Sequence, residues 1–155
     1  MSPTELQKIV QKIVEKTTKL KNKHTDEIDA PVNYVCILSH SKSEFKMLID
    51  STRKNSKIIK ETPTGPIFRI PTLPTISGDL KLLKIRKPDK NKPQLGYADF
   101  TIKAFSKFKE KCLLDNTFYS FTRPGHEIIG IKDSDTSVST YFANPPLDES
   151  LKDFL

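Results

Sequence analysis

The chain has 155 residues, a net charge of +7 carried mostly by lysine, and 35% hydrophobic residues. The length predicts a single domain, and we expect no membrane attachment and no secretory signal, because no apolar run approaches the roughly 20 residues of a membrane span. Only two cysteines, far apart in the sequence, argue against a disulfide framework or a cysteine metal site. We therefore expect a cytoplasmic protein, and because acidic residues interrupt the lysines, nucleic acid is not its favoured partner.

A helix is predicted at the start of the chain. Ser2 can cap it, Pro3 suits the first helical position, and Glu5 completes a capping box. Apolar residues then recur at helical spacing and form one stripe. We expect this helix to pack on the domain with its lysines in solvent, and residues 21–30 to form a polar linker. Residues 1–30 are thus interpreted as a helix and a linker.

The remainder, residues 31–155, is predicted to be one domain of two repeats, at about 31–90 and 94–150. Each repeat reads as a strand, a helix and three further strands. In the first repeat we expect strands at 32–38, 57–60, 67–70 and 80–86, a helix at 43–54 capped by Ser43, and a proline-containing loop at 71–78. In the second we expect strands at 96–102, 118–122, 127–131 and 138–142, and a helix at 105–113. Residues 148–155 are expected to form a short helix or to fray.

Short matches support the repeat. Residues 34–37 (Tyr-Val-x-Ile) and 97–100 (Tyr-Ala-x-Phe) are offset by 63 positions. Residues 43–46 and 106–109 share the pattern Ser-x-Phe-Lys at the same offset of 63. Strand and helix therefore keep their spacing, which is typical of a duplicated unit that cannot bury its core alone.

Two βαβββ units in one chain resemble the vicinal oxygen chelate superfamily, which includes glyoxalase I, extradiol dioxygenases and bleomycin-resistance proteins. With its leading helix, the chain is most similar to a YecM-like branch. The resemblance covers about residues 31–150 and is carried by the segments GPIFRI (65–70), LKLLKIRKP (80–88), GYADFTI (96–102) and YFANPPL (141–147). It implies an α+β fold in which two βαβββ units form a curled mixed sheet around a cavity with helices outside, and by analogy a homodimer.

The resemblance also locates a candidate site. Metal-using members of the superfamily take their ligands from the first and fourth strands of each unit. The corresponding positions here hold Tyr34, Lys84, Tyr97 and Tyr141, with Phe142 as the alternative to Tyr141. None is a favourable ligand for a divalent metal, and a lysine ammonium would repel one. The sequence therefore predicts that the metal ligands are lost and that no cofactor is bound.

Strand alternation predicts which side chains share the cavity face. The face is expected to hold Tyr34, Cys36, Lys84, Arg86, Tyr97, Asp99 and Tyr141. In one interpretation these residues satisfy each other, with Asp99 paired to Lys84 or Arg86 and the tyrosines filling the space. In the other, the tyrosines supply flat walls and the two cations hold an anionic or aromatic small molecule.

Three functions follow, and whether the protein is an enzyme stays open. The first is a metal-free small-molecule-binding protein. The second is an enzyme of the same fold that acts on a small organic acid, with Tyr97 or Asp99 as acid or base. The third is a nucleic-acid-associated protein that uses the lysine-rich helix. Cys36 is expected to be a buried, inert thiol, and residues 123–127 are expected to be a turn between strands.

Overall fold

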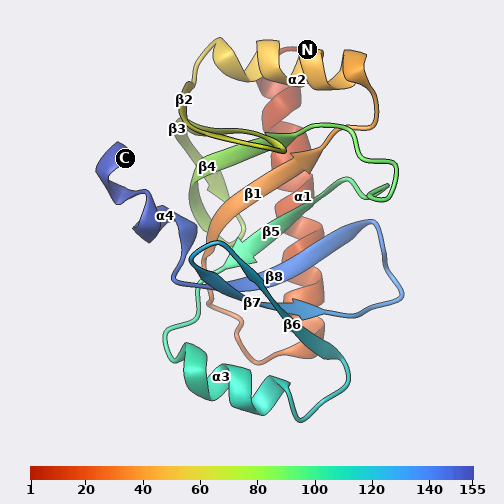
Figure 1. Ribbon diagram of the computed structural model, residues 1–155, viewed down its shortest axis with the longest axis vertical. Coiled ribbons are helices and arrows are strands. Elements are labelled where there is room, and N and C mark those ends of the chain that lie inside the picture. Colours follow the sequence, from red (N-terminus) through yellow and green to blue (C-terminus); the bar gives the residue numbers. More distant parts are fainter.

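The computed structural model describes all residues from 1 to 155. It confirms the expected α+β fold, in which a leading helix, α1 (Pro3–His24), precedes two βαβββ units (Figure 1). The first unit comprises β1 (Val32–Leu38), α2 (Lys42–Arg53), β2 (Lys57–Thr62), β3 (Gly65–Thr75) and β4 (Gly78–Arg86). The second comprises β5 (Gly96–Phe100), α3 (Phe105–Cys112), β6 (Phe118–Arg123), β7 (His126–Ile131) and β8 (Val138–Asn144). The chain ends with α4 (Leu147–Ser150) and a turn of 3-10 helix, η1 (Lys152–Phe154).

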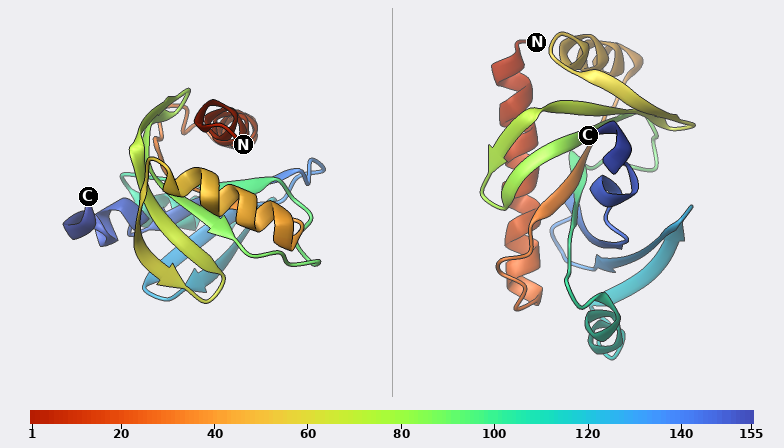
Figure 2. Two further views of the ribbon diagram at one scale, coloured as in Figure 1. Left: turned by 90° about the horizontal axis from the view of Figure 1, so that it is seen from above. Right: turned by 90° about the vertical axis from the view of Figure 1, so that its left-hand side faces the viewer.

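All eight strands belong to one mixed sheet in the order β2-β3-β4-β1-β5-β8-β7-β6. β1 and β5 are antiparallel neighbours at its centre, and each is flanked by a parallel partner, β4 and β8 respectively. The order of strands outward from the centre is therefore the same in both halves. The sheet curls without closing into a barrel, which leaves β2 and β6 as its edges (Figure 2).

Helices α1, α2 and α3 cover the convex face of this sheet. Helix α1 runs across both halves, with α2 near one end and α3 near the other (Figure 2). Its side chains Val10, Ile13 and Val14 are buried against sheet residues such as Val35 and Phe100, in a core cluster of 23 buried residues. None of the helices is long and apolar enough to cross a membrane.

Local hydrogen bonds explain where two helices begin. The predicted capping box of α1 is present: the Glu5 amide donates to Ser2 Oγ at 3.1 Å, and the Ser2 amide donates to the Glu5 carboxylate at 3.1 Å. The predicted cap of α2 is wrong by two residues. Ser41, not Ser43, caps this helix, because its Oγ accepts the Glu44 amide at 3.0 Å.

The end of α1 differs from the prediction. The helix continues to His24, into the segment expected to be a polar linker. Lys21 is fully buried there, and its ammonium donates to Asn22 Oδ1 at 2.8 Å, to the Ile28 carbonyl at 3.0 Å and to the Glu27 carbonyl. This lysine therefore holds the following loop against the helix instead of lying in solvent.

Strand β3 is also longer than predicted. It runs to Thr75, through Pro71 and Pro74, where a loop was expected. The register shifts between Arg69 and Leu73, and pairing with β4 resumes beyond this irregularity. A bulge of this kind accommodates proline, which has no amide hydrogen to give to the ladder.

The concave face of the sheet has a smaller apolar cluster of its own, made by Tyr34, Cys36, Leu38, Ile67, Leu82, Tyr97 and Leu151. Leu151 comes from the short C-terminal segment, residues 147–155, and is 6% exposed. Leu147 and Leu155 also pack against this cluster. The C-terminal segment therefore lies against the concave face, as the right-hand view of Figure 2 shows.

Candidate ligand site on the concave face

The register of the central strands brings the predicted site residues together on the concave face. In the β1–β5 pair Tyr34 lies opposite Asp99 and Cys36 opposite Tyr97, while the parallel neighbours place Lys84 beside Cys36 and Tyr141 beside Asp99. Arg86 follows two residues after Lys84 on the same strand. The alternate residues Val35, Ile37, Ala98 and Phe100 face the helices.

Tyrosine side chains fill the base of this face. Tyr34 and Tyr97 are only 3% and 9% exposed, and their hydroxyls lie 3.3 Å apart. The ring of Tyr141 meets that of Tyr97 edge to face, with centroids 5.3 Å apart. Burial raises the pKa of Tyr34 and Tyr97 well above the usual value, so both remain neutral phenols. The partly exposed side chains of Arg86, Phe121, Arg123 and Tyr141 form the rim of the concave face. A ligand could therefore reach this rim but not the base.

The buried carboxylate of Asp99 has a partner that the sequence did not indicate. Asp99 is 1% exposed, and its Oδ2 accepts a hydrogen bond of 2.9 Å from Arg123 Nη1 at the end of β6. The expected ion pair from Asp99 to Lys84 or Arg86 is therefore wrong. Burial raises the pKa of Asp99, and the Arg123 guanidinium opposes that rise. The second carboxylate oxygen, Oδ1, has no partner within the protein.

Arg123 is the functional candidate that the sequence analysis missed, because it was assigned to a turn. Its guanidinium carbon lies 5.1 Å from the ring centroid of Tyr97, 5.2 Å from that of Tyr141 and 5.6 Å from that of Phe121. Such cation–π contacts hold the cation over the rings. The alternation of Tyr119, Phe121 and Arg123 along β6 would have placed all three on one face. With its side chain 27% exposed and only one side-chain acceptor, the guanidinium has further N–H donors to offer.

Lys84 is a buried cation without an acidic partner. It is 8% exposed, and its ammonium donates one hydrogen bond, of 2.6 Å, to the Thr64 hydroxyl. Burial lowers the pKa of Lys84, and the positive charges of Arg86, Arg123 and Lys60 lower it further. The rim of the concave face thus concentrates positive charge around an ammonium that nothing in the protein neutralises.

Arg86 and Cys36, the two remaining residues predicted for this face, differ in their exposure to solvent. Arg86 is half-buried at the end of β4 and makes a loose ion pair of 3.6 Å with Asp89 of the connector. Its guanidinium therefore stays at the rim, where a ligand could share it. Cys36 is completely buried, and burial raises the pKa of its thiol to about 11. The thiol is protonated at neutral pH and is not a nucleophile there.

The residues on this face do not fit a divalent metal. The side chains of Tyr34, Lys84, Tyr97 and Tyr141 on this face are three phenols and an ammonium, and the carboxylate of Asp99 is already paired with Arg123. No three or more His, Cys, Asp or Glu side chains gather anywhere in the structure in a way that could hold a metal ion. A metal would also be repelled by the surrounding cations.

Comparisons with known proteins agree with the fold and say nothing about the chemistry. No family model and no curated protein matches the chain. A solved structure described as "Structural Genomics, Protein EC4020" superposes with a TM-score of 0.72 at 7% sequence identity, covering 98% of this chain and 92% of that chain. A glyoxalase/bleomycin resistance protein/dioxygenase superfamily member from Vibrio splendidus 12B01 superposes with a TM-score of 0.40 at 9% identity, covering 74% of this chain and 97% of that chain. The first likeness shows that the whole chain shares its fold with a solved protein.

Proposed function

We propose that the protein binds a small anionic molecule at the rim of the concave face without the help of a metal. The observation that carries this proposal is the buried ammonium of Lys84, which has a hydroxyl partner and no carboxylate. A buried charge is costly unless an opposite charge compensates it. A carboxylate or phosphate at the rim would supply that charge to Lys84, and Arg86 and Arg123 would add the forked hydrogen bonds that such oxygens accept.

The aromatic side chains near Arg123 favour a ligand with a flat apolar part. Phe121 and Tyr141 are half-buried, and their rings pack edge to face with centroids 5.3 Å apart. They present ring surface beside the cations, which suits an aromatic acid. Because Tyr34 and Tyr97 occupy the base, we expect the ligand to be small and to lie across the rim.

The binding function is favoured over the enzymatic alternative. An enzyme of this fold would need Tyr97 or Asp99 as acid or base. Tyr97 is buried against Tyr34, and Asp99 is buried and bonded to Arg123, so neither side chain is open to a substrate. No comparable obstacle affects binding. The nucleic-acid alternative through α1, the homodimer and the cytoplasmic location remain predictions.

Thermal unfolding with salicylate, benzoate and inorganic phosphate as probes tests the proposal. At least one probe should raise the unfolding midpoint of the wild-type protein. The shift should be absent in Lys84→Met and retained in Lys19→Met, which removes an exposed lysine of α1. Equal shifts in wild type and Lys84→Met, or no shift with any probe, would contradict the proposal. Stoichiometric metal in the purified protein, whose removal by a chelator abolished the shift, would contradict its metal-free form.

A further inference from the structure

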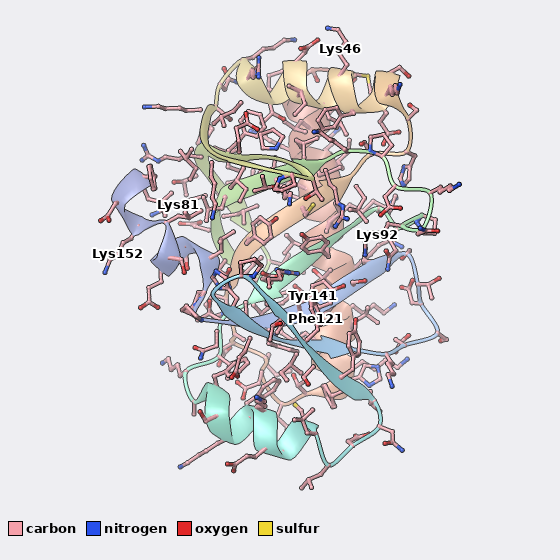
Figure 3. All side chains as sticks on the ribbon, in the orientation of Figure 1. Lys46, Lys81, Lys92, Phe121, Tyr141 and Lys152 are labelled. Atoms are coloured by element: carbon pink, nitrogen blue, oxygen red, sulfur yellow. The ribbon has the colours of Figure 1, made fainter.

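A second concentration of positive charge lies in a surface groove of about 640 Å³. The groove forms where the C-terminal end of α2 meets β2, β3 and β4. Its charged lining consists only of cations, Arg53, Lys54, Lys57, Arg69 and Lys81. Figure 3 shows Lys81 beside the C-terminal segment, whose Phe154 borders the groove. The groove shares no residue with the cations of the concave face.

The positive charge in this groove is only partly compensated within the protein: Asp148 lies near Lys81, and Asp50 lies near Arg53 and Lys54. None of the five cations takes part in any ion pair of the structure. Asp50 lies one turn before Arg53 on α2, but its carboxylate is bonded to Lys46 at 2.8 Å. Like charges that converge in a groove repel one another and create a strongly positive local potential. A bound polyanion would remove that repulsion.

The neutral part of the lining is suited to phosphate oxygens. Asn55, Ser56 and Thr72 lie among the cations and offer amide and hydroxyl donors. Guanidinium forks, ammonium groups and such donors are the groups that proteins use to hold phosphates. A groove of this volume can take a ligand with more than one phosphate group.

We propose that this groove binds a phosphate-rich polyanion, either a short free polyphosphate or the phosphodiester backbone of a single nucleic-acid strand. Recognition is through the phosphate oxygens in both cases. The groove is separate from the concave-face site, so this proposal does not depend on the function proposed above.

The test uses the full chain and two probes, sodium tripolyphosphate measured by calorimetry and a fluorescein-labelled oligouridylate measured by anisotropy. In the double variant Lys57→Gln/Arg69→Gln, two exposed cations that face each other across β2 and β3 are neutralised. Neutralising them should weaken binding by about tenfold or more and lower the slope of log Kd against log salt by about one to two. The control Lys103→Gln/Lys107→Gln removes the same charge from exposed positions at the start of α3 and just before it, and should stay within about twofold of wild type.

The two probes separate the sources of phosphate. Tighter binding of the oligouridylate at equal salt assigns the groove to a nucleic-acid strand, and tighter binding of tripolyphosphate assigns it to a small phosphorylated ligand. Lys84→Met should leave both affinities unchanged, which distinguishes the groove from the concave-face site. Equal weakening in the groove variant and its control, or no binding of either probe at low salt, would overturn the proposal.

Discussion

Replacing Lys84 with methionine removes a buried ammonium and keeps a flexible side chain of similar length. The ammonium makes one hydrogen bond, to Thr64, and losing a charge-assisted bond costs about 1.5–3 kcal/mol. Desolvation of an ammonium costs several kcal/mol, and nearby Arg86 and Arg123 add repulsion. We therefore expect Lys84→Met to raise the free energy of unfolding by about 1–2 kcal/mol at neutral pH, which corresponds to a rise in the unfolding midpoint of about 2–8 °C.

The dependence of this gain on pH follows from the sign of the pKa shift. Burial lowers the pKa of Lys84 in the folded protein, so between this value and the usual lysine pKa the unfolded chain binds more protons than the folded one. The stability of the wild-type protein therefore rises with pH across that window. The advantage of Lys84→Met should shrink accordingly as the pH approaches the usual pKa of lysine.

Urea unfolding followed by circular dichroism, at neutral pH and at alkaline pH, measures both effects. Lys81→Met is the matched control, because Lys81 is exposed on the same strand and its replacement should change stability by no more than about 0.5 kcal/mol. If Lys84→Met were less stable than wild type at neutral pH with an unchanged m-value, the ammonium would be net stabilising. The ammonium would then need no external anion to compensate its charge.

Three further changes test other parts of the structure. Arg123→Gln should lower the free energy of unfolding by about 2–4 kcal/mol, because it leaves the Asp99 carboxylate buried without its cation. This loss should shrink as falling pH protonates Asp99. A double-mutant cycle with Asp99→Asn in urea measures the coupling energy, and a coupling energy of zero would contradict the ion pair. Burial raises the pKa of Cys36 and of Cys112 to about 11, so both thiols should resist iodoacetamide in the native protein and react with it in concentrated guanidinium. Mass spectrometry measures the labelling, and rapid labelling of the native protein would show that these thiols are accessible. Leu151→Asp should detach the C-terminal segment and speed its hydrogen exchange, whereas unchanged exchange would mean that this contact does not hold it.

The alternation within single strands predicted which side chains lie on the concave face, but it did not predict which side chains of distant strands pair with them. The alternation of β1 and β5 placed Tyr34 and Tyr97 on the concave face because side-chain direction in a strand depends only on position. The partner of Asp99 could not be read in the same way. Nothing local distinguishes Arg123, which lies 24 positions away, from Lys84, since the choice depends on how far β6 curls over the face.

The sequence also did not predict where a residue occupies a place that is unusual for its type. Lys21 was assigned to a solvated linker because lysine is seldom buried, but loop carbonyls that follow it in the chain satisfy its ammonium. Pro71 and Pro74 argued for a loop because proline cannot give an amide to a ladder. The register shift that accommodates them arises from the pairing of β3 with β4, which no local pattern encodes.

The like order of strands in the two halves has a consequence for how a ligand can be oriented. β1 and β5 are antiparallel, so a half-turn about the middle of this pair would exchange Lys84 with Tyr141 and Cys36 with Asp99. If both halves carried the same residues, a ligand would fit equally well in two opposite directions. In the proposed binding mode, the ammonium of Lys84 lies in one half and the ring of Tyr141 lies at the equivalent place in the other, so the two directions of an acid with a flat tail are not equivalent. The differences at the two exchanged pairs, Lys84 with Tyr141 and Cys36 with Asp99, therefore make the two halves of a nearly symmetric face chemically unequal.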